Sequence, residues 1–504
     1  MSTMQSEDIK PREPQDEHIV ENKELNIWEA LIPVFALIIM LFYNVFFAFG
    51  DDALSGSNQF ILLMGGAVAA VVGIFNKVSF EQMMEEVAEN IKSTSGALLI
   101  LLMVGALAGT WLISGIIPTM VYYGLQILNP TIFLASCVII CAIISVATGS
   151  SWTTSATVGI ALIGISDALG ISLGMTAGAV LSGAYFGDKI SPLSDTTNLA
   201  PAMAGTDLFT HIKYMLYTTV PTITVTLIVF IIIGLNLDTS GAADTSEILA
   251  AVDSSINISP WLFIVPAVVI FLIIKKTPPL IALLIGTLLG GLAALIFQPE
   301  LVAQLGGGKS LDFLSGYRGI MNAITVDTAI PTENAALKDL FSAGGMSGML
   351  GTIWLIVCAM VFGGIMDGIG ALATISKALL KMFHTTFGLF ASTVASCLAL
   401  NLTASDQYLA IVVPGKMYAK AFREKGLAPE NLSRTLEDSG TVTSVLIPWN
   451  TCGAYQSGVL GVSVADYFVY AIFNWLSPFT TLLFAAFRIK IRMLSAPKEA
   501  SVKT

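Results

Sequence analysis

Long apolar stretches constrain this chain more than any other feature of its sequence. A helix that crosses a bilayer needs roughly 20 mostly apolar residues. Stretches of that kind include 27–49, 95–117, 214–236, 278–297 and 465–487, and shorter uncharged runs occur at 60–75, 259–274 and 386–402. With 55% hydrophobic and only 12% charged residues, the chain is a poor fit to a soluble multidomain protein. We therefore expect an all-α polytopic membrane protein with about ten full spans and several broken ones.

The ends of the chain and its cysteines suggest no further chemistry. Residues 1–26 are charged throughout and lack the apolar core of a signal peptide, so we predict a disordered cytoplasmic tail. All five cysteines lie in apolar segments without metal-ligand spacing and are expected to be core residues: Cys137, Cys141, Cys358, Cys397 and Cys452. The formal net charge of −11 argues against nucleic acid as a partner.

The distribution of basic residues predicts the orientation in the membrane. Cytoplasmic loops carry an excess of Lys and Arg. By this rule the loops with Lys77, Lys92, Lys275, Lys276, Lys377 and Lys381 and the basic tail 488–504 are cytoplasmic, as are both termini. Residues 51–59 and 237–256 contain no Lys or Arg and are expected outside. We predict a first membrane half at 27–236, an external loop at 237–258, and a second half at 259–487 with an external loop at 298–344.

The two halves share an order of segments at a fixed offset. Thr148 matches Thr403 (403 − 148 = 255), and the same offset pairs Ser150 with Ser405 and Asp195 with Asn450. Residues 166–172 have no basic side chain, whereas their counterpart at 416–434 has five, so the halves are predicted to be inverted. Inverted repeats with broken helices are typical of secondary transporters, which bind substrate near the middle of the membrane between the repeats.

Polar segments interrupt the apolar stretches at repeat-related places. The segment "YFGDKISPLSDTTN" (185–198) contains Pro192, which lacks an amide donor and breaks a helix. The segment "LEDSGTVTSVLIPWNTCGA" (436–454) repeats this device with Pro448. Irregular backbone at membrane depth survives only against protein or a watery cavity. Two more polar stretches, 145–159 and 401–415, are predicted to be the tips of re-entrant hairpins.

These segments supply carboxylate, hydroxyl and amide oxygens suited to a small hard cation. Charged residues within membrane segments are costly and therefore functional candidates. The predicted ligands of Na⁺ or another substrate are Asp188, Asp195, Ser191, Ser194, Thr196, Asn198, Thr148, Ser150, Ser151, Thr403, Ser405, Asp406, Glu437, Asp438, Thr441, Asn450 and Thr451. The candidate charge partners are Lys189, Arg434 and Asp367.

Several of these residues also have purely structural interpretations. Asp188 could pair with Lys189 at a helix end, and Asp195 could cap a helix. Glu437 and Asp438 could form a surface salt bridge with Arg434. Asp367 could sit at a membrane face.

The segment "GAYFGDKISPLSDTTNLAPAMAGTDLFTHIKYM" (183–215) closely resembles the NhaC-type Na⁺/H⁺ antiporter family, which includes sodium-coupled malate/lactate antiporters. A second stretch, "NLSRTLEDSGTVTSVLIPWNTCGAYQSGVLGV" (431–462), is similar to another hallmark of that family. The resemblance implies a bacterial or archaeal inner-membrane carrier with a scaffold domain and a transport domain. It would place 148–151, 188–198, 403–406 and 438–450 in the transport domain.

We therefore predict a secondary antiporter that exchanges Na⁺ for H⁺, not an enzyme, with no cofactor beyond the transported ions. The acids in the motifs outnumber the bases, which favours cations. An exchanger of small organic acids such as malate and lactate is the alternative, because Lys189 and Arg434 could hold a carboxylate. A channel is disfavoured by the inverted repeat within one chain, and an intramembrane hydrolase by the position of His18, His211 and His384 outside the polar breaks. We expect a homodimer in the lipid bilayer.

Overall fold

The computed structural model describes residues 25–49, 56–127, 129–237, 245–275, 277–332, 338, 341–382 and 385–494. Almost all of the predicted tail 1–26 lies outside these residues. Helices dominate the described part of the chain, as the sequence predicts. The exception is a short antiparallel ribbon between β1 (Thr328–Ala329) and β2 (Ser342–Ala343).

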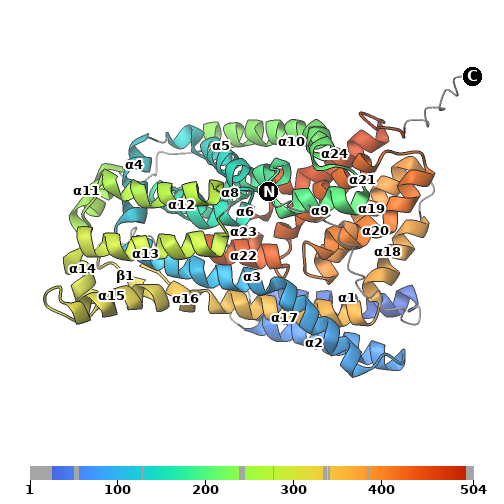
Figure 1. Ribbon diagram of the computed structural model, residues 1–504, viewed down its shortest axis with the longest axis horizontal. Coiled ribbons are helices and arrows are strands. Elements are labelled where there is room, and N and C mark those ends of the chain that lie inside the picture. Colours follow the sequence, from blue (N-terminus) through green and yellow to red (C-terminus); the bar gives the residue numbers. More distant parts are fainter. Residues whose placement is uncertain are drawn as a thin grey trace, which may run out of the picture.

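Eight helices of the described chain are long and apolar enough to cross a membrane. They are α1 (Ile27–Tyr43) continued by η1 (Asn44–Phe49), α2 (Ser57–Phe75), α3 (Phe80–Ile113), α5 (Pro130–Thr148), α10 (Leu208–Asn236), α13 (Pro279–Phe297), α16 (Gly345–Gly348) with α17 (Leu350–Gly368), and α19 (Thr386–Thr403) (Figure 1). The end of α11 (Thr245–Ser255) and the pair η4 (Pro260–Phe263) and α12 (Ile264–Ile274) would make a ninth span, bent by 88°.

The total is below the predicted ten because some apolar stretches are divided. The stretch 465–487 forms α23 (Val464–Phe468) and α24 (Ile472–Ala486), which is too short to count as a full span. The other helices are α4 (Ile116–Ile127), α6 (Ser151–Thr154), η3 (Ser155–Gly159), α7 (Ile160–Ala168), α8 (Leu173–Ile190), α9 (Asp195–Ala204), α14 (Pro299–Leu305), α15 (Phe313–Thr325), α18 (Ala371–Met382), α20 (Leu409–Glu424), α21 (Pro429–Leu436), η6 (Glu437–Thr441), η7 (Ser444–Leu446) and α22 (Thr451–Leu460).

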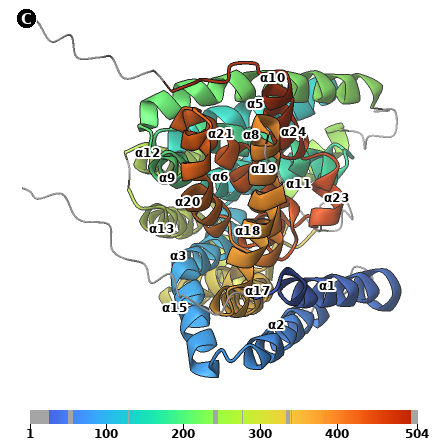
Figure 2. The ribbon, with the colours of Figure 1, turned by 90° about the vertical axis from the view of Figure 1, so that its right-hand side faces the viewer.

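Segments that the sequence predicts on opposite sides of the membrane lie far apart. Figure 1 shows α11, α14 and α15 at one end of the long axis, and α18, α20 and α21 at the other. In Figure 2, α1 and α2 lie at the edge opposite α10. The predicted external loop 298–344 contains α14, α15 and the β-ribbon, so it is a folded segment. Lys92, predicted in a loop, lies within α3.

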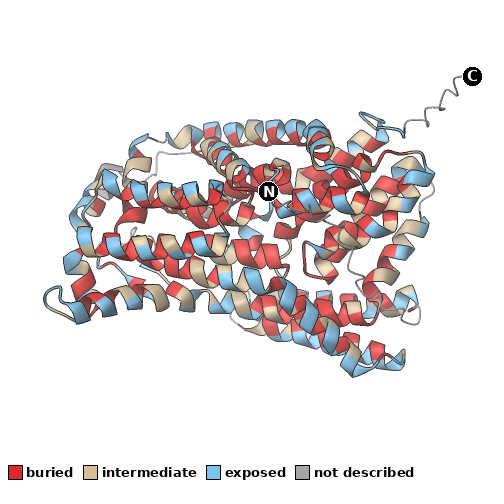
Figure 3. Ribbon diagram, in the orientation of Figure 1, coloured by how far each residue is buried: buried red, intermediate tan, exposed pale blue. Residues whose placement is uncertain are grey.

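Glycines bring the site-bearing helix α8 against α5. Gly183 and Gly187 face the α5 backbone around Val138 and Ser145 so closely that a side chain at either glycine would collide with it. Small residues allow this approach between membrane helices. Apolar side chains instead cover the outward faces of α10 and α13, where exposed residues follow the helices (Figure 3). Such an apolar exterior is expected of a protein surrounded by lipid.

Candidate functional site

The first predicted break separates α8 from α9. Helix α8 ends at Ile190, Ser191 is extended, and α9 begins at Asp195 with Ser194 as its N-cap. Pro192 lies in the gap, where its missing amide donor leaves no helical hydrogen bond unmade. The Ser191 hydroxyl donates a 2.8 Å hydrogen bond to the carbonyl of Val146 in α5, which fixes the break against that helix.

The second break lies between α21 and α22. Helix α21 continues through the π-helical turn η6 and the short η7, and regular helix resumes only at Thr451. Asn450 caps α22 by accepting a 3.0 Å hydrogen bond from the Cys452 amide. Its side-chain amide also donates a 3.0 Å hydrogen bond to the carbonyl of Asn401 in α19. Both predicted helix interruptions are therefore present.

A sharp turn packs against each break. Gly149 follows α5 with φ +71°, and an added Cβ there would lie 2.5 Å from the Cβ of Leu193 in the first break. Only glycine meets both requirements without strain. In the second half, Ser405 follows α19 with φ +59°, and its carbonyl accepts a 2.9 Å hydrogen bond from the Thr451 amide. Each turn is thus joined to the break of its own half.

The two turns and two breaks surround a cavity of about 530 Å³. Three carboxylates line it, from Asp188, Asp195 and Asp406, and no Lys, Arg or His is among its described lining residues. The predicted site residues at this cavity are Thr148, Ser150, Asp188, Ser194, Asp195, Thr196, Asp406 and Thr451. Within the described ranges, the three carboxylates do not converge as one metal-binding group, so hydroxyl oxygens would have to complete any cation shell.

Asp188 is the most firmly positioned acid in the cavity. Its side chain is buried and accepts hydrogen bonds from the hydroxyls of Ser151 and Ser194, each 2.6 Å long. The Ser194 hydroxyl also lies 3.1 Å from that of Thr196. Ser151 does not line the cavity, but its hydrogen bond orients the Asp188 carboxylate, which does. The Thr148 hydroxyl, in contrast, is buried at the cavity without a partner in the described structure.

The second half contributes a different wall. Asp406 is buried, and its carboxylate accepts a 2.9 Å hydrogen bond from the Leu409 amide at the start of α20. The side-chain oxygen of Gln407 accepts hydrogen bonds from Ser444 and Cys452, each 3.0 Å long. Across the cavity wall, the rings of Trp152 and Tyr455 are stacked with centroids 4.0 Å apart, although only Trp152 belongs to the lining.

Sequence reasoning missed several lining residues, namely Ser93, Thr94, Trp152, Thr153, Thr277, Gln407, Tyr408 and Cys452. Gln407 and Tyr408 directly follow Asp406, so the polar turn itself was a usable signal. The Thr277-Pro278-Pro279 interruption was another. Nothing in the local sequence of α3 marks Ser93 and Thr94, because they reach the cavity only through helix packing.

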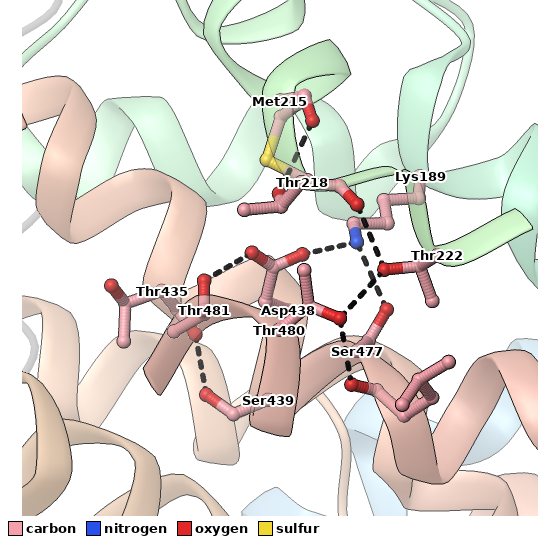
Figure 4. Close-up of polar contacts among 11 residues, drawn as sticks. Lys189, Met215, Thr218, Thr222, Thr435, Asp438, Ser439, Ser477, Thr480 and Thr481 are labelled. Atoms are coloured by element: carbon pink, nitrogen blue, oxygen red, sulfur yellow. Dashed lines mark hydrogen bonds and ion pairs between the residues drawn. The ribbon is translucent and has the colours of Figure 1, made fainter. Parts of the chain in front are cut away.

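Lys189 and Asp438 form a buried ion pair away from the cavity lining (Figure 4). Both side chains are fully buried. The Lys189 ammonium also donates a 3.2 Å hydrogen bond to Ser477, and Thr481 donates one to Asp438. The alternative interpretation that Asp188 pairs with Lys189 is therefore wrong for this structure.

Arg434 and Glu437 do not form the surface salt bridge considered from the sequence. Both are buried, and the Arg434 guanidinium lies 4.5 Å from the ring centroid of Tyr214 and 5.8 Å from that of Phe484. The Glu437 carboxyl oxygens and the Thr441 hydroxyl have no hydrogen-bond partner among the described residues.

The remaining predicted residues lie outside the lining of the cavity. Thr403 donates its hydroxyl to the Ala399 carbonyl at 2.7 Å, and the exposed Asn198 donates to the Pro192 and Ser194 carbonyls. Asp367 is half-buried near the end of α17. The residues of the prediction that are not at the cavity are Ser151, Ser191, Asn198, Thr403, Ser405, Glu437, Asp438, Thr441, Asn450, Lys189, Arg434 and Asp367.

Comparison with known proteins agrees with this architecture. Residues 183–489, which include both breaks, match the sequence model described as the Na⁺/H⁺ antiporter family. The chain is 37% identical over 417 residues to the Na⁺/H⁺ antiporter NhaC of Alkalihalophilus pseudofirmus, covering 83% of this chain and 87% of that protein. It is 36% identical over 425 residues to the malate-2H⁺/Na⁺-lactate antiporter of Bacillus subtilis, covering 83% and 86%.

A third relative covers more of the chain. The arginine/ornithine antiporter ArcD of Halobacterium salinarum is 31% identical over 482 residues, which is 94% of each protein. All three relatives are antiporters, and the family match contains the whole of both polar breaks. Together with the apolar helices, these matches establish that this multi-pass membrane protein belongs to the Na⁺/H⁺ antiporter family.

Proposed function

We propose that this protein exchanges Na⁺ for H⁺ across the cytoplasmic membrane of a bacterium or archaeon and that the cavity holds the cation. The observation that carries the proposal is the charge of the cavity: three carboxylates and no cationic side chain among its described lining. The name of the NhaC relative, at 37% identity, supports the same exchange.

The chemistry of the cavity suits competition between the two ions. Na⁺ is a hard cation that prefers oxygen ligands. Asp188 accepts hydrogen bonds from the hydroxyls of Ser151 and Ser194, and Thr148 and Thr196 line the same cavity. A carboxylate in a poorly solvated site is stabilised by either a proton or a cation. If only the neutralised site can move across the membrane barrier, one ion must leave before the other is carried back. That rule produces obligatory exchange.

Transport of small organic acids is the weaker alternative. The Bacillus subtilis relative is named for malate, lactate and Na⁺, so the chemistry occurs within the family. A carboxylate substrate would need cationic partners. Here the ammonium of Lys189 is paired with Asp438, and the guanidinium of Arg434 lies against Tyr214. Neither residue lines the cavity, so the site favours a bare cation.

Alternating access would follow from two inverted halves, each contributing a turn and a break. The acceptors of the two anchoring contacts support this proposal. Ser191 donates to the carbonyl of Val146 and Asn450 donates to that of Asn401, and 401 − 146 = 255, the offset of the sequence repeat, whereas the donors are 450 − 191 = 259 positions apart. We assign both breaks and both turns to a transport domain and the surrounding long helices to a scaffold domain. The homodimer stays a prediction from the sequence.

The cavity also suggests which side is open. Its lining includes Ser93, which follows Lys92, and Thr277, close to Lys275. Both lysines are predicted to be cytoplasmic by the positive-inside rule. We therefore propose that the cavity faces the cytoplasm in this conformation, with both termini on the same side.

Everted membrane vesicles energised to an acid interior would test the function. Addition of Na⁺ alone should raise the lumenal pH in vesicles that contain the protein, and control vesicles without it should show no change. Proton movement that requires malate or lactate in addition to Na⁺ would favour the organic-acid alternative. Movement of either ion down its own gradient without the other would contradict antiport.

A further inference from the structure

A second cavity lies outside the transport site, where the start of α10 meets the C-terminal segment. It has a volume of about 430 Å³ and is lined by Thr210, Lys213, Tyr214, Tyr217, Lys490, Ile491 and Arg492. The lining thus contains three cationic side chains, two phenol groups and one hydroxyl, but no carboxylate. This composition suits an anion, and we call this cavity the basic pocket.

Two of the three cations have no carboxylate partner among the residues that the structure describes. Within the described chain, no Asp or Glu oxygen lies within 4.0 Å of the ammonium of Lys213 or Lys490. Lys490 instead lies over the ring of Tyr217, 5.0 Å from its centroid. Arg492 forms a 2.7 Å ion pair with the buried Glu430. The pocket with this partner therefore has a formal charge of +2 from three cations and one carboxylate.

The C-terminal wall of the pocket is held firmly in place. The Arg492 carbonyl accepts hydrogen bonds from the Ala428 amide at 2.9 Å and from the side-chain amide of Asn431 at 2.7 Å. The Leu494 amide donates a 2.8 Å bond to Gly426. Lys490 has a left-handed backbone with φ +48°, which is uncommon for a residue other than glycine. A segment fixed in this way presents its cations in a defined geometry.

An apolar surface continues from the pocket along α10. Phe209, Leu216 and Val220 flank Lys213 and Tyr217 on this helix and are 66%, 39% and 48% exposed. Helix α10 is one of the helices long and apolar enough to cross the membrane. The pocket therefore lies at the end of a surface that lipid chains would cover. Basic pockets next to membrane helices on the cytoplasmic side bind the headgroups of anionic lipids.

We propose that the basic pocket binds the phosphate headgroup of an anionic phospholipid, whose acyl chains lie along the exposed face of α10. Lys213 and Lys490 would hold the phosphate as point charges, and Thr210 and Tyr217 can donate hydrogen bonds to its oxygens. Behind the pocket, its wall residue Tyr214 packs on the guanidinium of Arg434 in α21, the helix that precedes the second break. The site is independent of the ion carried in the transport cavity.

Native mass spectrometry of the purified, delipidated full-length protein would test this site. The protein would be titrated with dioleoylphosphatidylglycerol, with dioleoylphosphatidylcholine, or with inorganic phosphate alone. We expect preferential binding of phosphatidylglycerol. The double substitution Lys213→Gln, Lys490→Gln should lower its apparent affinity by about 25-fold, because each lysine near an anionic lipid surface adds about fivefold.

Two further double variants distinguish loss of the pocket from a general loss of positive charge. The pair Lys77→Gln, Lys381→Gln removes the same charge from exposed lysines outside the pocket and should bind like the unmodified protein. The pair Lys213→Arg, Lys490→Arg keeps the charge and should retain binding, which also controls for misfolding. Equal retention of phosphatidylglycerol by the glutamine pair at positions 213 and 490 would overturn the proposal. Displacement of the lipid by inorganic phosphate at matching concentration would overturn the assignment to a lipid.

Discussion

Lys189 forms a buried ion pair with Asp438, a residue 249 positions away in the other half of the chain. The preceding residue, Asp188, lines the cavity between the two breaks and accepts hydrogen bonds from Ser151 and Ser194. Neighbouring residues of α8 thus lie in two environments: Asp188 at a cavity and Lys189 in a closed charge pair. Movement of α8 between conformations would have to change both.

Substitution of the cavity carboxylate is the most direct test of the cation site. Asp188→Asn should reduce Na⁺-dependent proton movement by at least about tenfold, since hydrogen bonds to a charged group contribute about 1.5–3 kcal/mol. Asp195→Asn should act in the same direction. Asp188→Glu should keep some transport with an altered pH profile, because a titratable group survives at a different distance from the cation. Transport would be measured in everted vesicles at matched expression.

An acid outside the cavity supplies the control for these variants. Asp253 lies in α11, is exposed and does not line the transport cavity. Asp253→Asn removes the same charge and should leave exchange unchanged. Unaltered exchange and pH dependence in an expressed Asp188→Asn, Asp195→Asn double variant would contradict the proposed site.

Removal of one member of the buried ion pair should destabilise the protein more than removal of both. Removal of one partner leaves the other charge buried and unpaired, which costs about 3–5 kcal/mol. Lys189→Met should therefore lower the thermal midpoint strongly, and Asp438→Asn should do the same. The double variant Lys189→Met, Asp438→Asn should recover much of the loss because no charge is left without a partner. Fluorescence-detected size-exclusion chromatography after heating would measure this, and strictly additive losses would contradict the pairing.

The turn at Gly149 should not tolerate a side chain. A left-handed backbone costs an ordinary L-residue about 1–2 kcal/mol, and a Cβ would also collide with Leu193. Gly149→Ala should thus displace the first break and reduce transport. Gly351 in α17 is the matched control, because an added Cβ there has no heavy atom within 4 Å. Equal transport by the two alanine variants would show that the turn does not position the break.

The N-terminal cap of α10 should be lost at low pH, when the carboxylate of Asp207 is protonated. Asp207 caps this helix by accepting a 2.9 Å hydrogen bond from the Thr210 amide, and hydrogen bonds from the side chain and then the amide of Thr210 lower the pKa of its carboxyl group below the ordinary value. A lowered folded-state pKa means that the cap stabilises the helix fully above the unfolded value of about 3.9 and loses its effect as the pH falls through the folded value.

Hydrogen exchange at the first amides of α10 would detect this loss. After correction for intrinsic rates, protection should be constant from neutral pH down to about pH 5 and should fall only below about pH 4. In the Asp207→Ala variant, the protection of these amides should no longer fall below about pH 4. Loss of protection between pH 7 and pH 6 would point to a different titrating group.

Much of the architecture could be predicted because its causes are local. The length of an apolar stretch decides whether it can cross a bilayer. Pro192 has no amide hydrogen and lies in a polar segment, a combination that favours an interruption, whereas Pro33 and Pro221 lie inside apolar helices. Both helix interruptions and the membrane class followed from such signals, and the family followed from the resemblance of the segments 183–215 and 431–462. The number of spans was less certain from the sequence, because short irregular segments such as those between α23 and α24 depend on packing with other helices.

The identity of the residues that share the cavity was decided by tertiary structure. The sequence placed Asp188, Asp195, Asp406, Glu437 and Asp438 together as candidates, but only the first three line the cavity. Successive residues of a helix point about 100° apart, so Asp188 and Lys189 face different surroundings although they are adjacent. Which surroundings each side chain meets depends on segments far away in the chain, and Asp438 reaches Lys189 only when the two halves have packed together. The sequence by itself determined that carboxylates, hydroxyls and broken helices would occur in the membrane; the packing of the halves determined which acid remains available to a cation and which is neutralised by a lysine.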